Sequence, residues 1–163
     1  MIRGRDCLLG ELEALYVESF ESYVRVARAI TGDRERAFEV VQEGFARAMA
    51  ARETFRHESP LSAWVWRIVV NEARSQSRRP LIDAAYERAE VEPPARSAEL
   101  APLISALPER QRHAVFLRYY ADLDYRTIAA VLDVEVGTVG ATLAAAHQRL
   151  RTALREQEVT AGD

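Results

Sequence analysis

The chain has 163 residues, of which 48% are hydrophobic and 29% charged, as in a soluble globular protein with one large or two small cores. Its formal net charge of −3 is unusual for a nucleic-acid-binding protein, and all of its 22 basic residues are arginine. The single cysteine, Cys7, excludes an internal disulfide, and no Cys/His spacing indicates a metal site. The apolar run at residues 64–70 is too short to span a bilayer, and no signal pattern begins the chain. These features predict a cytoplasmic protein without membrane insertion, metal or cofactor.

Apolar residues at helical spacing predict two helices in the first 52 residues. The first covers residues 8–30 and ends at Gly32, a natural left-handed C-cap residue. The second covers about residues 34–52 and begins after Asp33, which can cap it. Its core face is expected to contain Ala37, Val40, Val41, Phe45, Ala48 and Met49.

A third helix is predicted over about residues 61–78, with Ser59 as its N-cap and Pro60 in its first turn. Trp64 shares a helical face with Ile68 and is expected in the core. Trp66 is one step off that face and is expected to be exposed.

Residues 80–102 change in character. Pro93, Pro94 and Pro102 are expected to break any helix, and five acidic residues lie among small ones. We interpret this segment as a flexible acidic linker with one helical turn near residues 83–88. It divides an all-α chain into two small domains, residues 8–79 and 103–157.

The second domain is predicted to begin with a helix started by Pro108, which buries Val115, Phe116 and Tyr119. A short helix over about residues 125–132 follows, with Asp124 as its N-cap.

After a break of three residues, a longer helix starts at about Val136. Its apolar stripe recurs at steps of three and four residues, at Val139, Leu143, Ala146, Leu150 and Leu154. This arrangement is typical of a helix-turn-helix unit, whose second helix enters the DNA major groove. A hairpin that only packs against itself would have the same spacing.

Three groups of motifs occur along the chain. They are Leu15-Tyr16 with residues 29–33 (AITGD) and 41–48 (VQEGFARA); residues 55–60 (FRHESP) with 63–68 (AWVWRI) and Asn71; and residues 107–112 (LPERQR) with 117–119, 125–129 and 137–139. In this order they resemble a bacterial RNA polymerase sigma factor of the sigma-70 family, extracytoplasmic-function (ECF) subfamily. The resemblance covers roughly residues 12–155.

The resemblance implies that residues 8–79 are sigma domain 2, which binds core RNA polymerase and melts the promoter. Residues 103–157 would be sigma domain 4, which carries the helix-turn-helix. Implied partners are core RNA polymerase and promoter DNA, with an anti-sigma factor as a further candidate. The polar face of the second helix would dock on a coiled coil of the largest polymerase subunit, through Glu39, Gln42, Glu43 and Arg47. An ordinary solvated face is the alternative.

The resemblance also implies promoter contacts in both domains. Strand opening needs a pocket for an unstacked base, which aromatic faces and arginines can provide. The candidates in domain 2 are Phe55, Arg56 and His57 on a loop, Trp66, and a polar stripe formed by Arg67, Asn71, Arg74 and Arg78. The candidates in domain 4 are Arg126, Thr138, Thr142 and His147.

The second helix of the hairpin departs from the family pattern. Family members usually carry lysine and arginine just after the Gly-Thr-Val triplet, whereas no charged residue lies between Val136 and Ala146 here. The helix therefore lacks bidentate contacts to guanine, each worth about 1–3 kcal/mol of discrimination. Recognition of the upstream promoter element is expected to be divergent. Ser75 also stands where an aspartate is common.

Three functions can be compared with these features of the sequence. The first is a working sigma factor that directs promoter-specific transcription initiation. The second is a sigma-like interaction module that binds polymerase or an anti-sigma partner without reading promoters. The third is an enzyme, which no paired-carboxylate, Ser/His/Asp, Cys/His or Gly-rich phosphate motif supports.

Overall fold

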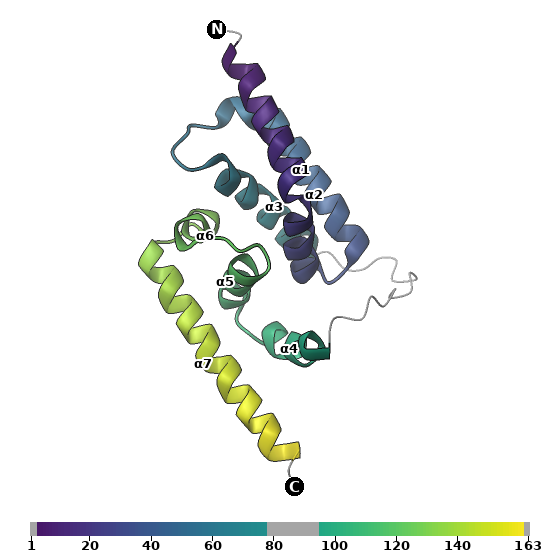
Figure 1. Ribbon diagram of the computed structural model, residues 1–163, viewed down its shortest axis with the longest axis vertical. Coiled ribbons are helices and arrows are strands. Elements are labelled where there is room, and N and C mark those ends of the chain that lie inside the picture. The colour runs from purple at the N-terminus through teal and green to yellow at the C-terminus, as the bar shows by residue number, and fades with distance from the viewer. Residues whose placement is uncertain (1–2, 78–94, 162–163) are drawn as a thin grey trace.

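The computed structural model describes residues 3–77 and 95–161, which contain no strand. Their elements are α1 (Arg3–Thr31), α2 (Arg34–Ala51), the 3-10 turn η1 (Arg52–Thr54), α3 (Leu61–Ser77), α4 (Ala95–Ser105), α5 (Glu109–Tyr119), α6 (Tyr125–Leu132) and α7 (Val136–Ala161). Helices α1 to α3 form the first domain and α4 to α7 the second (Figure 1). The predicted all-α class with two helical domains is confirmed.

The predicted caps are confirmed at three helix ends. The Asp33 carboxylate accepts a hydrogen bond from the Arg36 backbone N–H at 2.8 Å, and Gly32 before it has a φ of 76°. Asp124 accepts from the Thr127 N–H at 2.7 Å and starts α6. Helix α6 therefore covers the predicted residues 125–132.

Two predictions about proline are wrong. The Pro60 carbonyl accepts hydrogen bonds from the N–H groups of Ala63 and Trp64, so Pro60, and not Ser59, is the residue that precedes the first turn of α3. Pro102 lies inside α4 and does not break it. The missing N–H of one proline costs a hydrogen bond, but Leu100 packs against the core and Ile104 is buried in it. The helical turn predicted near residues 83–88 lies outside the described residues.

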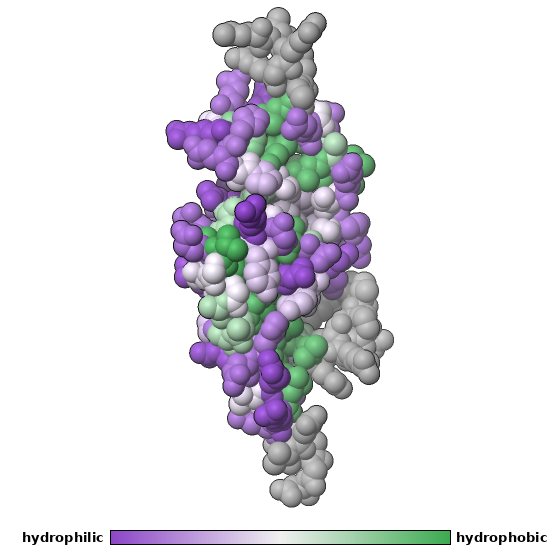
Figure 2. All heavy atoms as spheres, turned by 60° about the vertical axis from the view of Figure 1, so that its left-hand side comes forward, coloured by the Kyte–Doolittle hydropathy of each residue, from purple (hydrophilic) through white to green (hydrophobic). Residues whose placement is uncertain are grey.

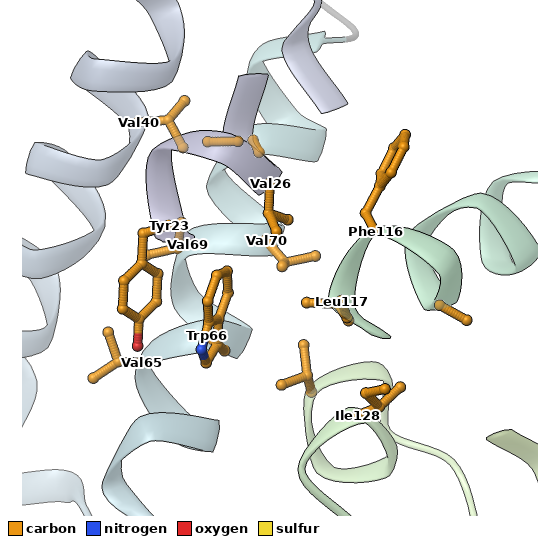
Figure 3. Packing of buried hydrophobic residues seen from close by; sticks show 14 of the residues in the cluster. Tyr23, Val26, Val40, Val65, Trp66, Val69, Val70, Phe116, Leu117 and Ile128 are labelled. Carbon is orange, nitrogen blue, oxygen red and sulfur yellow. The ribbon is translucent and has the colours of Figure 1, made fainter. Parts of the chain in front are cut away.

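The core of the first domain lies between α1, α2 and α3. A close approach at Gly44 brings α2 against α3, because an added Cβ there would lie 2.7 Å from Cγ2 of Val69. The Trp66 ring stacks on Tyr23 with ring centroids 3.9 Å apart (Figure 3). Met49, expected in this core, is exposed.

The prediction that Trp66 is exposed is therefore wrong. Its side chain is only 2% exposed, whereas Trp64 is half-buried with its ring centroid 5.3 Å from that of Phe55. The buried face of α3 is wide, because the helix packs on α1 and α2 and also on α6. It is centred one position further along than the periodicity indicated, on Val65, Trp66, Val69, Val70 and Ala73.

In the second domain, α6 and α7 cross as the predicted helix-turn-helix. Asp133 takes a left-handed conformation with φ of 56°, which turns the chain between them. Val139, Leu143 and Ala146 of α7 are buried as predicted. No single described helix is long and apolar enough to cross a membrane, and α6 and α7 pass that test only when joined across their 96° bend.

The two domains pack against each other. Buried residues of both belong to one continuous core, and α3 lies along α6 (Figures 1 and 3). At the centre, Val70 of α3 lies beside Leu117 of α5 (Figure 3). The Arg25 guanidinium of α1 donates to the Tyr120 carbonyl at 3.0 Å. The sequence did not predict this arrangement.

Candidate polymerase and promoter interfaces

The polar face of α2 is exposed, as a docking surface requires. Glu39, Glu43 and Arg47 are four residues apart and share one face, with Gln42 beside them, and all four are exposed. Arg47 Nε donates to Glu43 Oε1 at 2.7 Å, and its Nη1 lies 2.7 Å from Oε2 of Glu72 on α3. The hydrogen bond to Glu43, followed by the charge of Glu72, raises the pKa of Arg47. The structure thus holds Arg47 in a defined orientation.

The loop between η1 and α3 brings the predicted aromatic residues together. The Phe55 ring lies 4.5 Å from that of His57, measured between centroids, and also contacts Trp64. Phe55 is half-buried, while Arg56 and His57 are exposed. His57 has φ of 57°, a conformation that a non-glycine residue seldom adopts. This cluster offers aromatic faces on which a base could stack.

The polar stripe of α3 faces the second domain in this structure. Arg67 donates through Nε and Nη2 to the Ala130 carbonyl at 3.1 and 2.7 Å, and Arg74 Nε lies 2.7 Å from Glu109 Oε1. Arg67 also lies 3.7 Å from Asp133. Arg78 is outside the described residues. A cleft of about 500 Å³ lies between the domains, lined by Arg67, Val70, Asn71, Arg74, Glu109, Arg110, His113, Val131, Leu132 and Asp133.

His113 is a buried titratable group on the wall of this cleft. Its side chain is 4% exposed, and burial lowers its pKa to about 4. The nearby Glu109 opposes this shift, and the arginines Arg74 and Arg112 add to it. His113 is therefore neutral at pH 7.

We expect His113 to make the fold sensitive to acid. The unfolded chain takes up a proton near pH 6.5, whereas the folded chain does so only near pH 4, so stability is lost as pH falls between these values. The loss is about 1.4 kcal/mol per pH unit, or about 2 kcal/mol from pH 7 to pH 5. Urea unfolding at both pH values measures it. The His113→Leu variant should lose distinctly less stability over this interval, and equal losses would contradict the expectation.

The candidate DNA-binding residues of domain 4 lie on the two helices of the helix-turn-helix. Arg126 is exposed at the start of α6, and Thr138 and Thr142 are partly exposed on α7. The His147 Nε2 lies 2.8 Å from the Tyr119 hydroxyl, and Tyr119, expected in the core, is 55% exposed.

The solvent face of α7 is uncharged over its first turns. Its exposed residues up to position 145 are Val136, Gly137, Ala141, Ala144 and Ala145. Figure 2 shows green and pale spheres among purple ones at mid-height on this side of the molecule. On these first turns, Thr138 and Thr142 are the side chains that carry a hydrogen-bonding group.

Sequence reasoning missed the groups that hold the candidate residues in place. Glu72 is buried at 6% exposure in spite of its charge, and the Ala130 carbonyl and Glu109 receive the arginines of α3. The position of Glu72, three residues after Val69 on the apolar face of α3, could have indicated that its carboxylate is buried and paired. No group of three or more His, Cys, Asp or Glu residues in the described part of the chain could hold a metal ion.

A two-domain helical protein with a helix-turn-helix, an arginine stripe and an exposed polar face has features that are typical of DNA-binding transcription proteins. Comparison with known proteins narrows this class. Residues 16–80 match the model of sigma-70 region 2, and residues 97–150 match that of sigma-70 region 4.

Two curated relatives cover most of the chain. It is 32% identical over 145 residues to the RNA polymerase sigma-H factor of Pseudomonas aeruginosa, covering 76% of this chain and 75% of that protein. It is 35% identical over 134 residues to the ECF RNA polymerase sigma-E factor of Escherichia coli K12, covering 69% and 70%. The chain belongs to the sigma-70 family, in its ECF subfamily. As a sigma factor, it binds core RNA polymerase and directs transcription initiation at promoters.

Two solved structures have the same fold. CnrH in complex with the cytosolic domain of CnrY has a TM-score of 0.72 at 24% identity, covering 89% of this chain and 88% of that one. The sigma factor RpoE of Bartonella quintana, in complex with the anti-sigma factor NepR, has a TM-score of 0.69 at 22% identity, covering 89% and 97%.

Proposed function

We propose that this sigma factor engages core polymerase through Glu39, Gln42, Glu43 and Arg47 on α2, and promoter DNA through the other candidate residues except Trp66, which is buried. The observation that carries the proposal is the exposed α2 face, in which Arg47 is fixed by two carboxylates. The loop cluster around Phe55 would hold an unstacked base, and the α3 arginines would contact phosphates. The chain itself would catalyse no reaction and would act in the cytoplasm.

The experiment that tests this function is transcription from sheared genomic DNA by purified core polymerase, with and without the chain. New RNA 5′ ends that share an upstream motif are expected. An interaction module that binds polymerase without reading promoters would give no new starts. That alternative is not favoured, because regions 2 and 4 both occur in the chain in their family order.

We further propose that the two domains separate when the chain binds a promoter. In the structure, the guanidinium of Arg67 is occupied by the Ala130 carbonyl and that of Arg74 by Glu109. These contacts turn both side chains toward the second domain, so a DNA backbone that follows the α3 stripe would have to displace that domain. A partner that binds both domains would instead keep them together. An anti-sigma factor is the candidate for such a partner, because RpoE, which has a similar fold, is in complex with the anti-sigma factor NepR.

Energy transfer between fluorophores would detect this separation. We expect high transfer in the free chain between labels at the exposed Glu18 of α1 and Thr152 of α7, introduced as cysteines in a Cys7→Ser background. Addition of core polymerase and promoter DNA should lower the transfer. Unchanged transfer in a complex that is active in transcription would contradict the proposal.

The absence of charged residues from the first turns of α7 leads to a prediction about DNA affinity. Arginine at the exposed Ala141 and Ala144 should raise the affinity of the full chain for promoter DNA at low salt. Each added phosphate contact should steepen the slope of log affinity against log salt by about 0.9. The matched control is Val17→Arg on α1, an exposed position outside both the helix-turn-helix and the loop around Phe55. Equal gains from both positions would show that α7 does not lie in a groove.

A further inference from the structure

Glu72 is a charged residue in a buried position of α3. Its carboxylate accepts a hydrogen bond from Gln76 Nε2 at 3.0 Å through Oε1 and binds the Arg47 guanidinium at 2.7 Å through Oε2. The side chain of Glu72 is 6% exposed, whereas that of Arg47 is 56% exposed. The pair therefore links a rigid, buried carboxylate to a guanidinium on the surface of α2.

Stability alone does not account for this pair. Placing a carboxylate in a buried site costs free energy that the ion pair only partly returns, and an apolar side chain of similar size would fill the site at less cost. The pair does fix the orientation of the Arg47 guanidinium. With Glu43 on Nε and Glu72 on Nη1, the Arg47 side chain is held at two of its nitrogens, and among the described residues nothing binds Nη2. A guanidinium fixed in this way loses less conformational entropy when it binds a partner.

We propose that Glu72 is a positioning residue for polymerase binding, which holds the Arg47 guanidinium in the orientation in which the α2 face meets core polymerase. This inference rests on the proposed role of Arg47. It also gives α3 two tasks on opposite faces, because Arg67 and Arg74 lie on its other side. Glu72 itself does not touch polymerase, and it acts only through Arg47.

The test uses the full chain and purified core polymerase, with affinity measured by competition against a labelled copy. Glu72→Met keeps the size of the side chain but removes both acceptor oxygens. Because Arg47 is exposed and keeps Glu43, this variant should fold with nearly unchanged thermal stability. Its affinity for polymerase should fall about 3- to 10-fold, the range expected for ordering one long side chain on binding. Glu72→Gln retains an acceptor oxygen and should restore most of the affinity.

A double-mutant cycle separates this inference from the function on which it rests. Arg47→Ala should weaken binding at least as much as Glu72→Met, and adding Glu72→Met to Arg47→Ala should have no further effect. If Arg47→Ala weakens binding but Glu72→Met does not, the positioning role is overturned while the contact of Arg47 stands. If Arg47→Ala itself leaves affinity unchanged, both fall. A loss with Glu72→Met that persists in the Arg47→Ala background would also overturn the inference, since Glu72 would then act by another route.

Discussion

Replacing Trp66 with alanine is expected to lower the free energy of unfolding by about 3–5 kcal/mol, the range for removing a large buried aromatic side chain. Trp66 is 2% exposed and stacks on Tyr23, which is itself fully buried. It also lies where the first domain meets the second, near Val70 and Leu117 (Figure 3). Removal should therefore weaken both the core of α1 to α3 and the packing between the domains. Urea unfolding followed by circular dichroism measures the change.

Two variants serve as controls for this prediction. Trp66→Phe keeps a ring on Tyr23 and should lose clearly less stability. Trp64→Ala removes a half-buried ring that contacts Phe55, and should cost about 1–2 kcal/mol. If Trp66→Ala unfolded like the wild type yet failed to open promoters, a stacking role for Trp66 would have to be reinstated. Because Trp64 contacts Phe55 in the proposed base-binding cluster, Trp64→Ala should also reduce promoter opening under conditions in which the variant is fully folded.

Local signals in the sequence were sufficient for most helix ends. Asp124 and Asp33 cap helices as predicted. The short carboxylate of an aspartate just before a helix can accept a hydrogen bond from a free backbone N–H of the first turn. The stripe of α7 was also predictable, since burial of Val139, Leu143 and Ala146 follows directly from helical period.

The wrong predictions concern residues whose environment depends on contacts with distant parts of the chain. Pro102 was expected to break a helix, but packing of the surrounding apolar residues compensates for one missing N–H. Trp66 was placed on the surface because periodicity finds one apolar stripe, whereas α3 contacts helices of both domains and buries a wider face. The bond from Arg67 to the Ala130 carbonyl had no signal in the sequence at all, since a backbone acceptor from a distant segment carries no residue type.

The contact at Gly44 shows the same limit, because glycine within a helix carries no sign of whether its missing side chain matters. A Cβ at Gly44 would lie 2.7 Å from Cγ2 and 3.3 Å from Cα of Val69, so α2 and α3 can approach this closely only without it. The distance between these helices also sets the Arg47–Glu72 contact, which bridges them. Gly10 of α1, by contrast, has no neighbouring atom within 4 Å of the same position.

The same substitution is therefore expected to have opposite effects at the two glycines. Gly44→Leu should lower the free energy of unfolding by about 3 kcal/mol, because the added carbons force α2 away from the backbone of α3. Gly10→Leu should raise it by up to about 1 kcal/mol, since leucine favours the helix and meets open space. Thermal or urea unfolding of both variants measures the difference. Gly44→Leu should also lose affinity for core polymerase, as the separation of α2 from α3 releases Arg47 from Glu72. Equal stability changes at both positions would mean that the helices are not in contact at Gly44.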